Sequence, residues 1–592
     1  MLLPATRSWP RLSALLCLAC AAVATTRGQA QTLFGDGFET SGVTSLNAGV
    51  GVNLEGVREF SPEYHFVDAF KQSRAWTTSV VGGAFDTDEA QCLQLDANGF
   101  VLTLVPNAAV AGCASATYNS VLTTMLEGVT EAPAGQYTVS FDGAGTIAYS
   151  GVSNLNTATP GRHTFTYNPA NGILVLRITA ITPGNHLRNI RVWMPGFDDS
   201  NGPAQLFHPD FLRVLTDAKF RALRFMDWAV TNGEFFVPNA QIAFNDRPRV
   251  SDARYTSTRG VPLEVMIALA NRVDAEPWFN LPHQVSDDYV SQYAALVRDT
   301  LDPGRRLYVE YSNEVWNGGF PQGGQIEAAA NASMPGLGDS GFTRRMNQHG
   351  HRTAQVCTIF RQVFAAQAGR VRCVLGAQAA NTFIASEALS CPLAIQAGLR
   401  ATPCRNDIDA VAIAPYIGDY IGGAVNQSIV AGWGLNELFA ELNSSRQQLF
   451  DPFAFPSPGP VLTQSALGIA RDRVIAHRQM LSTQFPGVAL VAYEGGQHLV
   501  GIQGVENDNV ITALFGNANR DVRMGNVLAT HLAQWKSDGG ELFMHFNSTF
   551  RYGRFGNWGL IERIDQPPAS AKYTAVKNFI AANPCWWSAC TP

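Results

Sequence analysis

Eight short apolar runs, spread along the whole chain and separated mostly by helical patterns, constrain the fold more than any other feature. Each run is nearly continuous rather than alternating, which is typical of parallel strands that are covered on both faces. Eight such strands with helices between them predict an α/β fold, the (β/α)₈ barrel. The runs lie around Val52 and at residues 222–228, 277–282, 307–314, 371–376, 410–416, 488–494 and 542–547.

The clearest helix start lies between the third and the fourth run. Ser286 is a good N-cap, and the acidic pair 287–288 suits the first turn. Val290, Ala294 and Val297 then fall on one helical face. Similar patterns predict further helices near residues 64–74, 346–366, 466–484, 520–535 and 569–582.

Residues 90–195 follow a different pattern from the rest of the chain. Short alternating segments are separated by Gly, Asn and Pro turns, which is typical of a β-sandwich. The predicted strands are residues 101–105, 136–141, 163–167 and 173–178. Because this stretch follows the first apolar run, we expect a β-sandwich inserted after the first barrel strand, with the barrel formed by residues 49–89 and 196–584.

The N-terminus has the form of a secretory signal. Arg7 and Arg11 precede an apolar stretch at residues 12–24, and small residues follow. Cleavage after Ala24 or Ala30 is consistent with this pattern. We therefore expect a signal peptide over residues 1–30, a flexible tail over 31–48, and a secreted or periplasmic protein. Residues 585–592 are expected to form a packed C-terminal tail.

The cysteines fit an exported chain. Of the ten cysteines, Cys17 and Cys20 lie in the expected signal, and an even number remains. Their clustering favours local pairs, although free buried thiols stay an alternative: 92 with 113, 357 with 373, 391 with 404, and 585 with 590. No Cys/His spacing resembles a zinc site, and we expect no metal.

Composition excludes several classes of function. The 592 residues are 46% hydrophobic and 15% charged, which indicates a globular chain. The net charge is −6 without a basic block, which argues against nucleic acid as a partner. No segment after the N-terminal stretch is long and apolar enough to span a membrane. We expect a monomer that needs no cofactor.

Two of the apolar runs end in a carboxylic acid. The fourth run ends in Asn313-Glu314, with Trp316 two residues on, and the seventh ends in Tyr493-Glu494. In a barrel of this kind, the reactive groups lie at the C-terminal ends of the strands. Two carboxylates from two strand ends are the minimum apparatus for cutting a glycosidic bond.

These residues resemble the retaining glycoside hydrolases of clan A, a group that includes cellulases and mannanases. The resemblance covers roughly residues 50–80 and 205–580. It implies that Glu314 is the acid/base, Glu494 the nucleophile, and Asn313 a contact to the sugar 2-hydroxyl. It further implies that Arg224 keeps the nucleophile ionised and that three other side chains line the site: His283, Tyr416 and Trp558.

The chain departs from the clan's commonest cellulase family in two places. Pro415-Tyr416 lacks the His-x-Tyr form, and the eighth run has no Trp at its end, so that Trp558 falls in the following loop. The inserted β-domain is also atypical. The resemblance therefore indicates the clan and no particular family.

The expected chemistry requires opposite protonation states of the two acids. Glu314 must be protonated, so its pKa should be raised, and Glu494 must be ionised, with Arg224 and the Tyr493 hydroxyl as candidates to hold it so. Retention requires carboxyl groups about 5 Å apart, and inversion roughly 6.5–9.5 Å. The substrate is expected to be a β-linked polysaccharide or oligosaccharide. The alternatives are an inverting hydrolase and a catalytically inactive carbohydrate-binding surface protein.

Several residues allow a structural interpretation as well as a functional one. Trp316 and Trp228 are either platforms for sugar rings or core residues. Arg224 is either a site residue or an ion-pair partner of Asp227, and Glu310 is a structural candidate. The β-sandwich aromatic residues fit core packing as well as they fit sugar binding.

Overall fold

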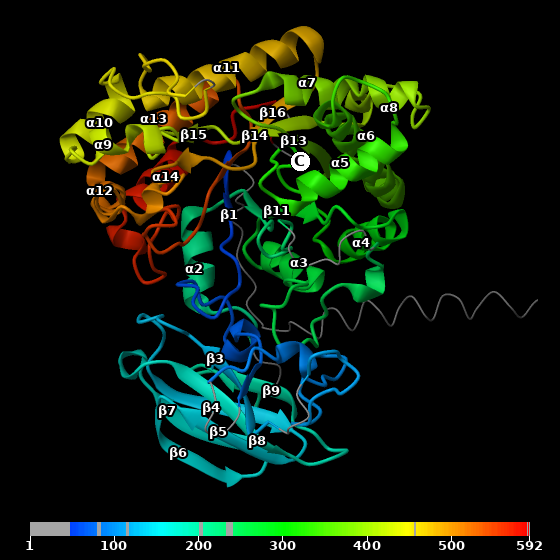
Figure 1. Ribbon diagram of the computed structural model, residues 1–592, viewed down its shortest axis with the longest axis vertical. Coiled ribbons are helices and arrows are strands. Elements are labelled where there is room, and N and C mark those ends of the chain that lie inside the picture. Colours follow the sequence, from blue (N-terminus) through cyan, green and yellow to red (C-terminus); the bar gives the residue numbers. More distant parts are fainter. Residues whose placement is uncertain are drawn as a thin grey trace, which may run out of the picture.

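The structure consists of a barrel and a smaller β-domain beside it (Figure 1). The computed structural model describes residues 48–79, 85–113, 118–200, 205–232, 241–454, 457–588 and 590. The expected signal peptide and, apart from residue 48, the expected tail lie outside these residues.

Eight parallel strands close into a barrel in the order β1-β10-β11-β12-β13-β14-β16-β18. The register of the last pair, Val50 against Phe543, joins the first strand to the eighth. The predicted (β/α)₈ barrel is therefore confirmed, with one strand in each of the eight apolar runs. The strands are β1 Val50–Asn53, β10 Ala222–Arg224, β11 Glu276–Leu281, β12 Leu307–Tyr311, β13 Val371–Gly376, β14 Ala410–Ile413, β16 Ala489–Ala492 and β18 Phe543–His545.

Helices surround the barrel and alternate with its strands (Figure 1). Ser286 caps the helix predicted to follow it, because its side chain accepts a hydrogen bond from the Tyr289 amide. The helices are α2 Pro209–Ala218, α3 Leu263–Arg272, α4 Asp287–Thr300, α5 Pro321–Ser333, α6 Gly341–Phe364, α7 Thr382–Ser390, α8 Pro392–Gln396, α9 Gln427–Val430, α10 Leu435–Ser444, α11 Ala466–Gln484, α12 Asn509–Arg520, α13 Val522–Ser537 and α14 Ala571–Ala582.

The β-domain lies between β1 and β10 in the chain, as predicted, and contains two four-stranded antiparallel sheets. One sheet has the order β2-β3-β8-β5 and the other β6-β7-β4-β9. Its first strand, β2, precedes the boundary predicted at residue 90. The strands are β2 Thr77–Ser79, β3 Ser120–Met125, β4 Gly135–Asp142, β5 Gly145–Ser150, β6 Val152–Thr159, β7 Arg162–Tyr167, β8 Leu174–Ile181 and β9 Arg188–Trp193.

Two predicted elements are wrong. The helix expected over residues 64–74 is only the short 3-10 helix η2, Ala69–Gln72, because Asp68 forms an antiparallel bridge with Trp193 and accepts from the Val192 amide. These contacts tie the segment to the edge of β9. The strand expected over residues 101–105 is reduced to a single bridge between Val101 and Leu95.

The aromatic residues of the β-domain pack inward. Tyr137 is fully buried, stacks on Phe165 and meets Tyr167 edge to face. Core packing therefore accounts for these rings. The four predicted cysteine pairs are joined as disulfides, with Cα–Cα distances of 5.6 to 5.8 Å.

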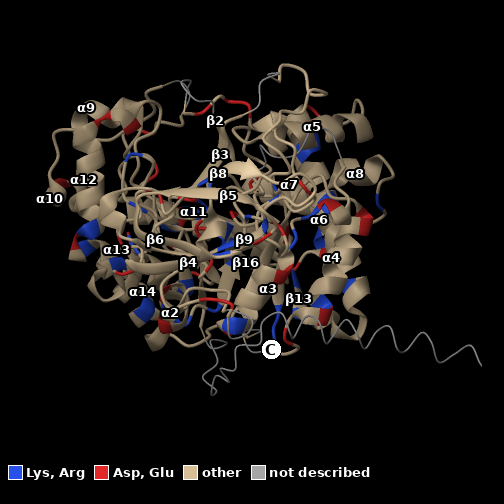
Figure 2. Ribbon diagram, turned by 90° about the horizontal axis from the view of Figure 1, so that it is seen from below, with Lys and Arg blue, Asp and Glu red and all other residues tan. Residues whose placement is uncertain are grey.

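Acidic and basic residues are interspersed over the outer helices (Figure 2). Within the described residues no helix is long and apolar enough to cross a membrane.

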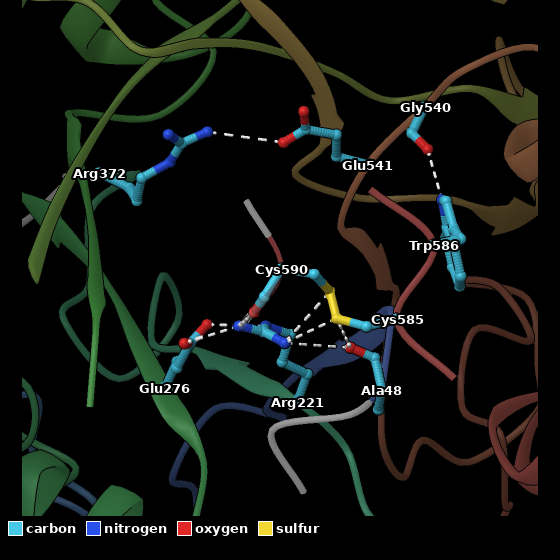
Figure 3. The surroundings of a disulfide bond; sticks show 9 residues. All are labelled: Ala48, Arg221, Glu276, Arg372, Gly540, Glu541, Cys585, Trp586 and Cys590. Atoms are coloured by element: carbon cyan, nitrogen blue, oxygen red, sulfur yellow. Dashed lines mark hydrogen bonds and ion pairs between the residues drawn. A yellow bond between two sulfur atoms is a disulfide. The ribbon is translucent and has the colours of Figure 1, made fainter. Parts of the chain in front are cut away.

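The C-terminal segment covers the end of the barrel at which the strands begin (Figure 3). Arg221, just before β10, forms a bidentate pair with Glu276, the first residue of β11, at 2.9 Å for both contacts. The same guanidinium donates to the Cys590 carbonyl at 2.6 Å and lies 5.5 Å from the Trp587 ring. The described residues of the tail are thus packed, and they cover a buried ion pair.

Replacing Arg221 with Met should destabilise the fold by roughly 3–5 kcal/mol, because Glu276 would remain buried without its ion-pair partner. Both side chains of this pair are fully buried. Urea unfolding of the purified variant measures the effect. The double variant Arg221→Met/Glu276→Leu should recover most of the loss, since it removes both charges. A single variant as stable as the parent would contradict the role given to the pair.

Candidate active site

Glu314 lies in the turn that follows β12. This turn places two non-glycine residues in the left-handed region, Ser312 at φ 63° and Glu314 at φ 42°. Such backbone costs free energy and is commonly found where a side chain must be aimed. Asn317 reinforces the turn, because its amide donates to Glu314 Oε2 at 2.9 Å.

Glu494 lies between β16 and the short strand β17, Gly496–Gln497, which pairs with β15, Tyr416–Ile417. The two residues after Glu494 must be glycines, because a side chain at either position would clash with a neighbour. A Cβ on Gly495 would come within 2.4 Å of the Phe543 ring. A Cβ on Gly496 would come within 2.7 Å of the His545 ring, at a φ of 125°. The Glu-Gly-Gly sequence thus lets this strand end pass close to β18.

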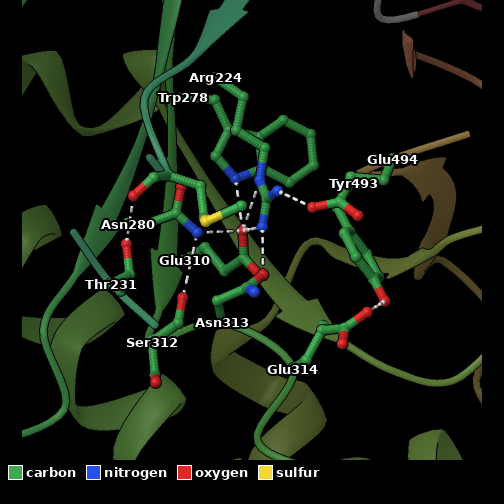
Figure 4. A network of polar contacts seen from close by, with 12 residues as sticks. Arg224, Thr231, Trp278, Asn280, Glu310, Ser312, Asn313, Glu314, Tyr493 and Glu494 are labelled. Atoms are coloured by element: carbon green, nitrogen blue, oxygen red, sulfur yellow. Dashed lines mark hydrogen bonds and ion pairs between the residues drawn. The ribbon is translucent and has the colours of Figure 1, made fainter. Parts of the chain in front are cut away.

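Arg224 connects the two strand ends that carry the acids (Figure 4). Its Nη1 donates to Glu494 Oε1 at 2.8 Å, and its Nη2 donates to Asn313 Oδ1 at 2.8 Å. Nε and Nη2 also donate to Glu310 Oε2, at 3.1 and 2.9 Å. This fully buried guanidinium therefore forms an ion pair with Glu494, the candidate nucleophile. Among the described residues it has no direct contact with Asp227.

A tyrosine hydroxyl donates to each carboxyl group. Tyr416 Oη donates to Glu494 Oε2 at 2.9 Å. Tyr493 was expected to hold Glu494, but it donates instead to Glu314 Oε1 at 2.8 Å. Its ring points into the barrel and reaches across the mouth, with the Arg224 guanidinium 5.0 Å from the ring centre. Burial raises the pKa of both tyrosines well above the usual range, so both stay donors.

The environments of the two carboxyl groups differ in charge. Burial raises the pKa of both Glu314 and Glu494, and the Glu314 carboxylate raises that of Glu494 further. Arg224 is the strongest influence that lowers the pKa of Glu494. On Glu314, its effect ranks below the hydrogen bonds from Asn317 and Tyr493. Because Arg224 bonds Glu494 and has no hydrogen bond to Glu314, it favours the ionised form of Glu494 more directly than that of Glu314.

The remaining predicted residues fall into two groups. Trp558 lies at the site, because its ring packs 5.8 Å from that of Tyr416 and 4.8 Å from that of His498. His283 Nε2 lies 2.6 Å from Gln325 Oε1, and neither acid is among its hydrogen-bond partners in the described residues. Trp316 is half-buried and packs against the core.

Trp228 is a core residue and not a platform for sugar rings. Its side chain is 1% exposed and packs among Phe211, Phe225 and Phe66. Its indole nitrogen donates to the Glu55 carbonyl at 2.9 Å. Neither face of the ring is open to a ligand.

Glu310 has a larger part in the site than its sequence position indicated. Its Oε2 accepts from Trp278 Nε1 at 2.8 Å and from Asn280 Nδ2 at 2.7 Å, besides the two bonds from Arg224. Asn53, at the end of β1, also contacts Arg224, at 3.1 Å. The signal for Glu310 was an acid inside an otherwise apolar strand, a position that requires a buried partner.

No grouping of three or more His, Cys, Asp or Glu side chains suited to a metal ion occurs in the described part of the chain. No model of a known protein family matches this sequence, and no curated protein matches it.

Solved structures of low similarity include a β-glucosidase from Thermotoga maritima (10% identity, TM-score 0.32, covering 63% of this chain and 85% of that one). A glycoside hydrolase family 5 enzyme from Prevotella bryantii has 10% identity and a TM-score of 0.31, covering 63% of this chain and 86% of that one. A family 5 xyloglucanase from Bacteroides ovatus has 11% identity and a TM-score of 0.33, covering 78% of this chain and 96% of that one. These scores are low, so the strand pairing and the site geometry carry the argument.

Proposed function

We propose that this protein is an exported retaining glycoside hydrolase that cleaves β-linked polysaccharide or oligosaccharide. The observation that carries the proposal is the pair of acids, Glu494 buried and Glu314 half-buried, at two strand ends of one barrel mouth. Arg224 donates to Glu494 alone of the two, at 2.8 Å, and a separate tyrosine donates to each acid. Two carboxyl groups in different electrostatic environments are what double displacement at a sugar requires.

The proposed reaction has two steps. The Glu494 carboxylate attacks the anomeric carbon while Glu314 gives its proton to the departing glycosidic oxygen. This step leaves a glycosyl ester on Glu494 and an ionised Glu314. Glu314 then takes a proton from a water molecule, which attacks the same carbon and releases Glu494. Both acids return to their starting states.

A panel of β-linked polysaccharides tests the proposal. The purified protein should release reducing ends from at least one of β-glucan, β-mannan and β-xylan, whereas Glu314→Gln/Glu494→Gln should release none. Binding without any hydrolysis across the panel would favour an inactive carbohydrate-binding protein. Equal release by the double variant would place the chemistry elsewhere.

The two tyrosines give a prediction for the pH profile of kcat/KM. Tyr493 stabilises the ionised form of Glu314, so Tyr493→Phe should raise the pKa of that group and move the alkaline limb to higher pH. Tyr416 stabilises ionised Glu494, so Tyr416→Phe should move the acidic limb to higher pH. A hydrogen bond to a charged group predicts shifts of about one pH unit. If each variant moves the limb assigned to the other, the roles of the two acids must be exchanged.

A further inference from the structure

A cavity of about 480 Å³ adjoins the carboxyl pair on the side of β1 and β10. Its walls include Asp227, three residues after Arg224, and residues 319–321 of the loop that follows Glu314. Asn232, also in the wall, accepts from Asn313 Nδ2 at 2.8 Å. The cavity is thus next to the site and has the size of a small-molecule binding site.

The polar groups that face this space differ from those at the reacting centre. Asp227 and Arg58 lie close together across Gly56: a Cβ on Gly56 would be 3.4 Å from Arg58 Nε and 3.7 Å from Asp227 Cβ. Within the described residues the Asp227 carboxylate has no hydrogen-bond donor. Arg58 is exposed. An acceptor and a donor therefore stand side by side, each with bonding capacity left.

The far wall of the cavity is a loop that is hydrogen-bonded to the segment leading into the inserted domain. Tyr255 and Thr256 line the cavity. The Tyr255 amide donates to the Lys71 carbonyl at 2.8 Å, and the Thr256 hydroxyl donates to the Ser73 carbonyl at 2.5 Å. Asn98, within the insertion, accepts from the Ala253 amide at 2.7 Å. The insertion thereby fixes the loop that limits the cavity.

The balance of charge around the cavity is negative. Glu55 is 8% exposed. Burial raises the pKa of Glu55 most, and the charge of Asp227 raises it further. Asp227 also raises the pKa of Glu494, which shows that the acids lie within electrostatic reach. Arg58 and Arg224 both lower the pKa of Asp227, so two guanidinium groups oppose the three carboxyl groups of Glu55, Asp227 and Glu494. An anionic ligand would meet repulsion here, whereas a neutral polyol would not.

We propose that this cavity is a subsite for a neutral sugar residue, in which Asp227 accepts hydrogen bonds from adjacent ring hydroxyls and Arg58 donates to them. Adjacent hydroxyls both donate and accept, and this pair of side chains offers both functions within a few ångströms. The excess of carboxyl groups around the cavity disfavours uronic acids. This inference rests on the proposed function and names the class of sugar that the site takes.

Calorimetry on the full chain carrying Glu494→Gln tests the subsite without hydrolysis. The probes are cellotetraose, mannotetraose, xylotetraose and the β-1,4-linked tetramer of glucuronic acid, which differs from cellotetraose in its carboxylates. We expect at least one neutral tetramer to bind. Adding Asp227→Ala should weaken that binding about tenfold or more, Arg58→Gln should weaken it by less, and the glucuronic acid tetramer should bind at least about tenfold more weakly than cellotetraose. Asp288→Asn, on the exposed face of α4, is the matched control and should change nothing.

The inference fails if no neutral tetramer binds, if Asp227→Ala and Arg58→Gln both leave the affinity unchanged, or if the uronic acid tetramer binds as tightly as cellotetraose. Thermal unfolding of each variant separates lost binding from lost fold. Hydrolysis by the otherwise unmodified enzyme with an unchanged KM in Asp227→Ala would refute the subsite and leave the proposed function standing. If binding depends on Asp227 but the protein hydrolyses nothing, the subsite would stand and the proposed function would be refuted.

Discussion

Glu494→Gln should lower kcat/KM on the polysaccharide by on the order of 10⁴-fold or more, because the nucleophile of a covalent mechanism has no substitute. Glu314→Gln should lower it by roughly 10²–10⁴-fold, the usual contribution of a general acid. Both variants should fold, since glutamine keeps the shape and still accepts hydrogen bonds from Arg224 or from Tyr493.

An aryl glycoside whose leaving group needs no proton distinguishes the role of Glu314 from that of Glu494. With the dinitrophenyl glycoside of whichever sugar the panel identifies, Glu314→Gln should release a burst of dinitrophenolate, followed by slow turnover. Glu494→Gln should give no burst. Glu506→Gln, in a loop outside the site, is the matched control and should behave as the parent. A burst from the Glu494 variant and none from the Glu314 variant would reverse the assignment.

Arg224→Met should reduce both stability and activity. The substitution leaves Glu310 and Glu494 buried without their cation, which we expect to cost roughly 3–5 kcal/mol of unfolding free energy at neutral pH. Activity should fall at least about 10³-fold, because Glu494 would then hold a proton.

The stability loss in Arg224→Met should depend on pH. Arg224 lowers the pKa of Glu494, so without it the folded-state pKa of that group lies further above the unfolded value and the folded state binds a proton more tightly. The loss should therefore be small near pH 4 and grow as the pH rises through the raised pKa. Urea unfolding at pH 5 and pH 8 measures this trend. Adding Glu310→Gln should restore part of the stability and none of the activity, and a loss of equal size at both pH values would contradict the charge argument.

The sequence predicted the barrel well because buried parallel strands leave a strong pattern. All eight apolar runs became barrel strands, and the runs that end in Glu314 and Glu494 placed both acids at the barrel mouth. The predicted helix 466–484 has the same bounds as α11. The 64–74 prediction failed because its apolar spacing also fits a segment whose backbone is held by β9.

The contacts between strands that are not neighbours could not be predicted. β12 and β16 are separated by β13 and β14 in the barrel, so only closure of the sheet brings Tyr493 to Glu314. For the same reason, the sequence predicted that this hydroxyl would hold Glu494, its neighbour in the chain. Glu310 shows the same limit: its residue type signalled a buried partner, but not that the partner would be Arg224.

The anomer released first from the polysaccharide tests the central claim most directly. Proton NMR during the first minutes of hydrolysis, before mutarotation, identifies that anomer. Double displacement through Glu494 predicts that the β-anomer appears first and that the α-anomer follows at the rate of mutarotation. Initial release of the α-anomer would contradict this account and would make the enzyme an inverting hydrolase.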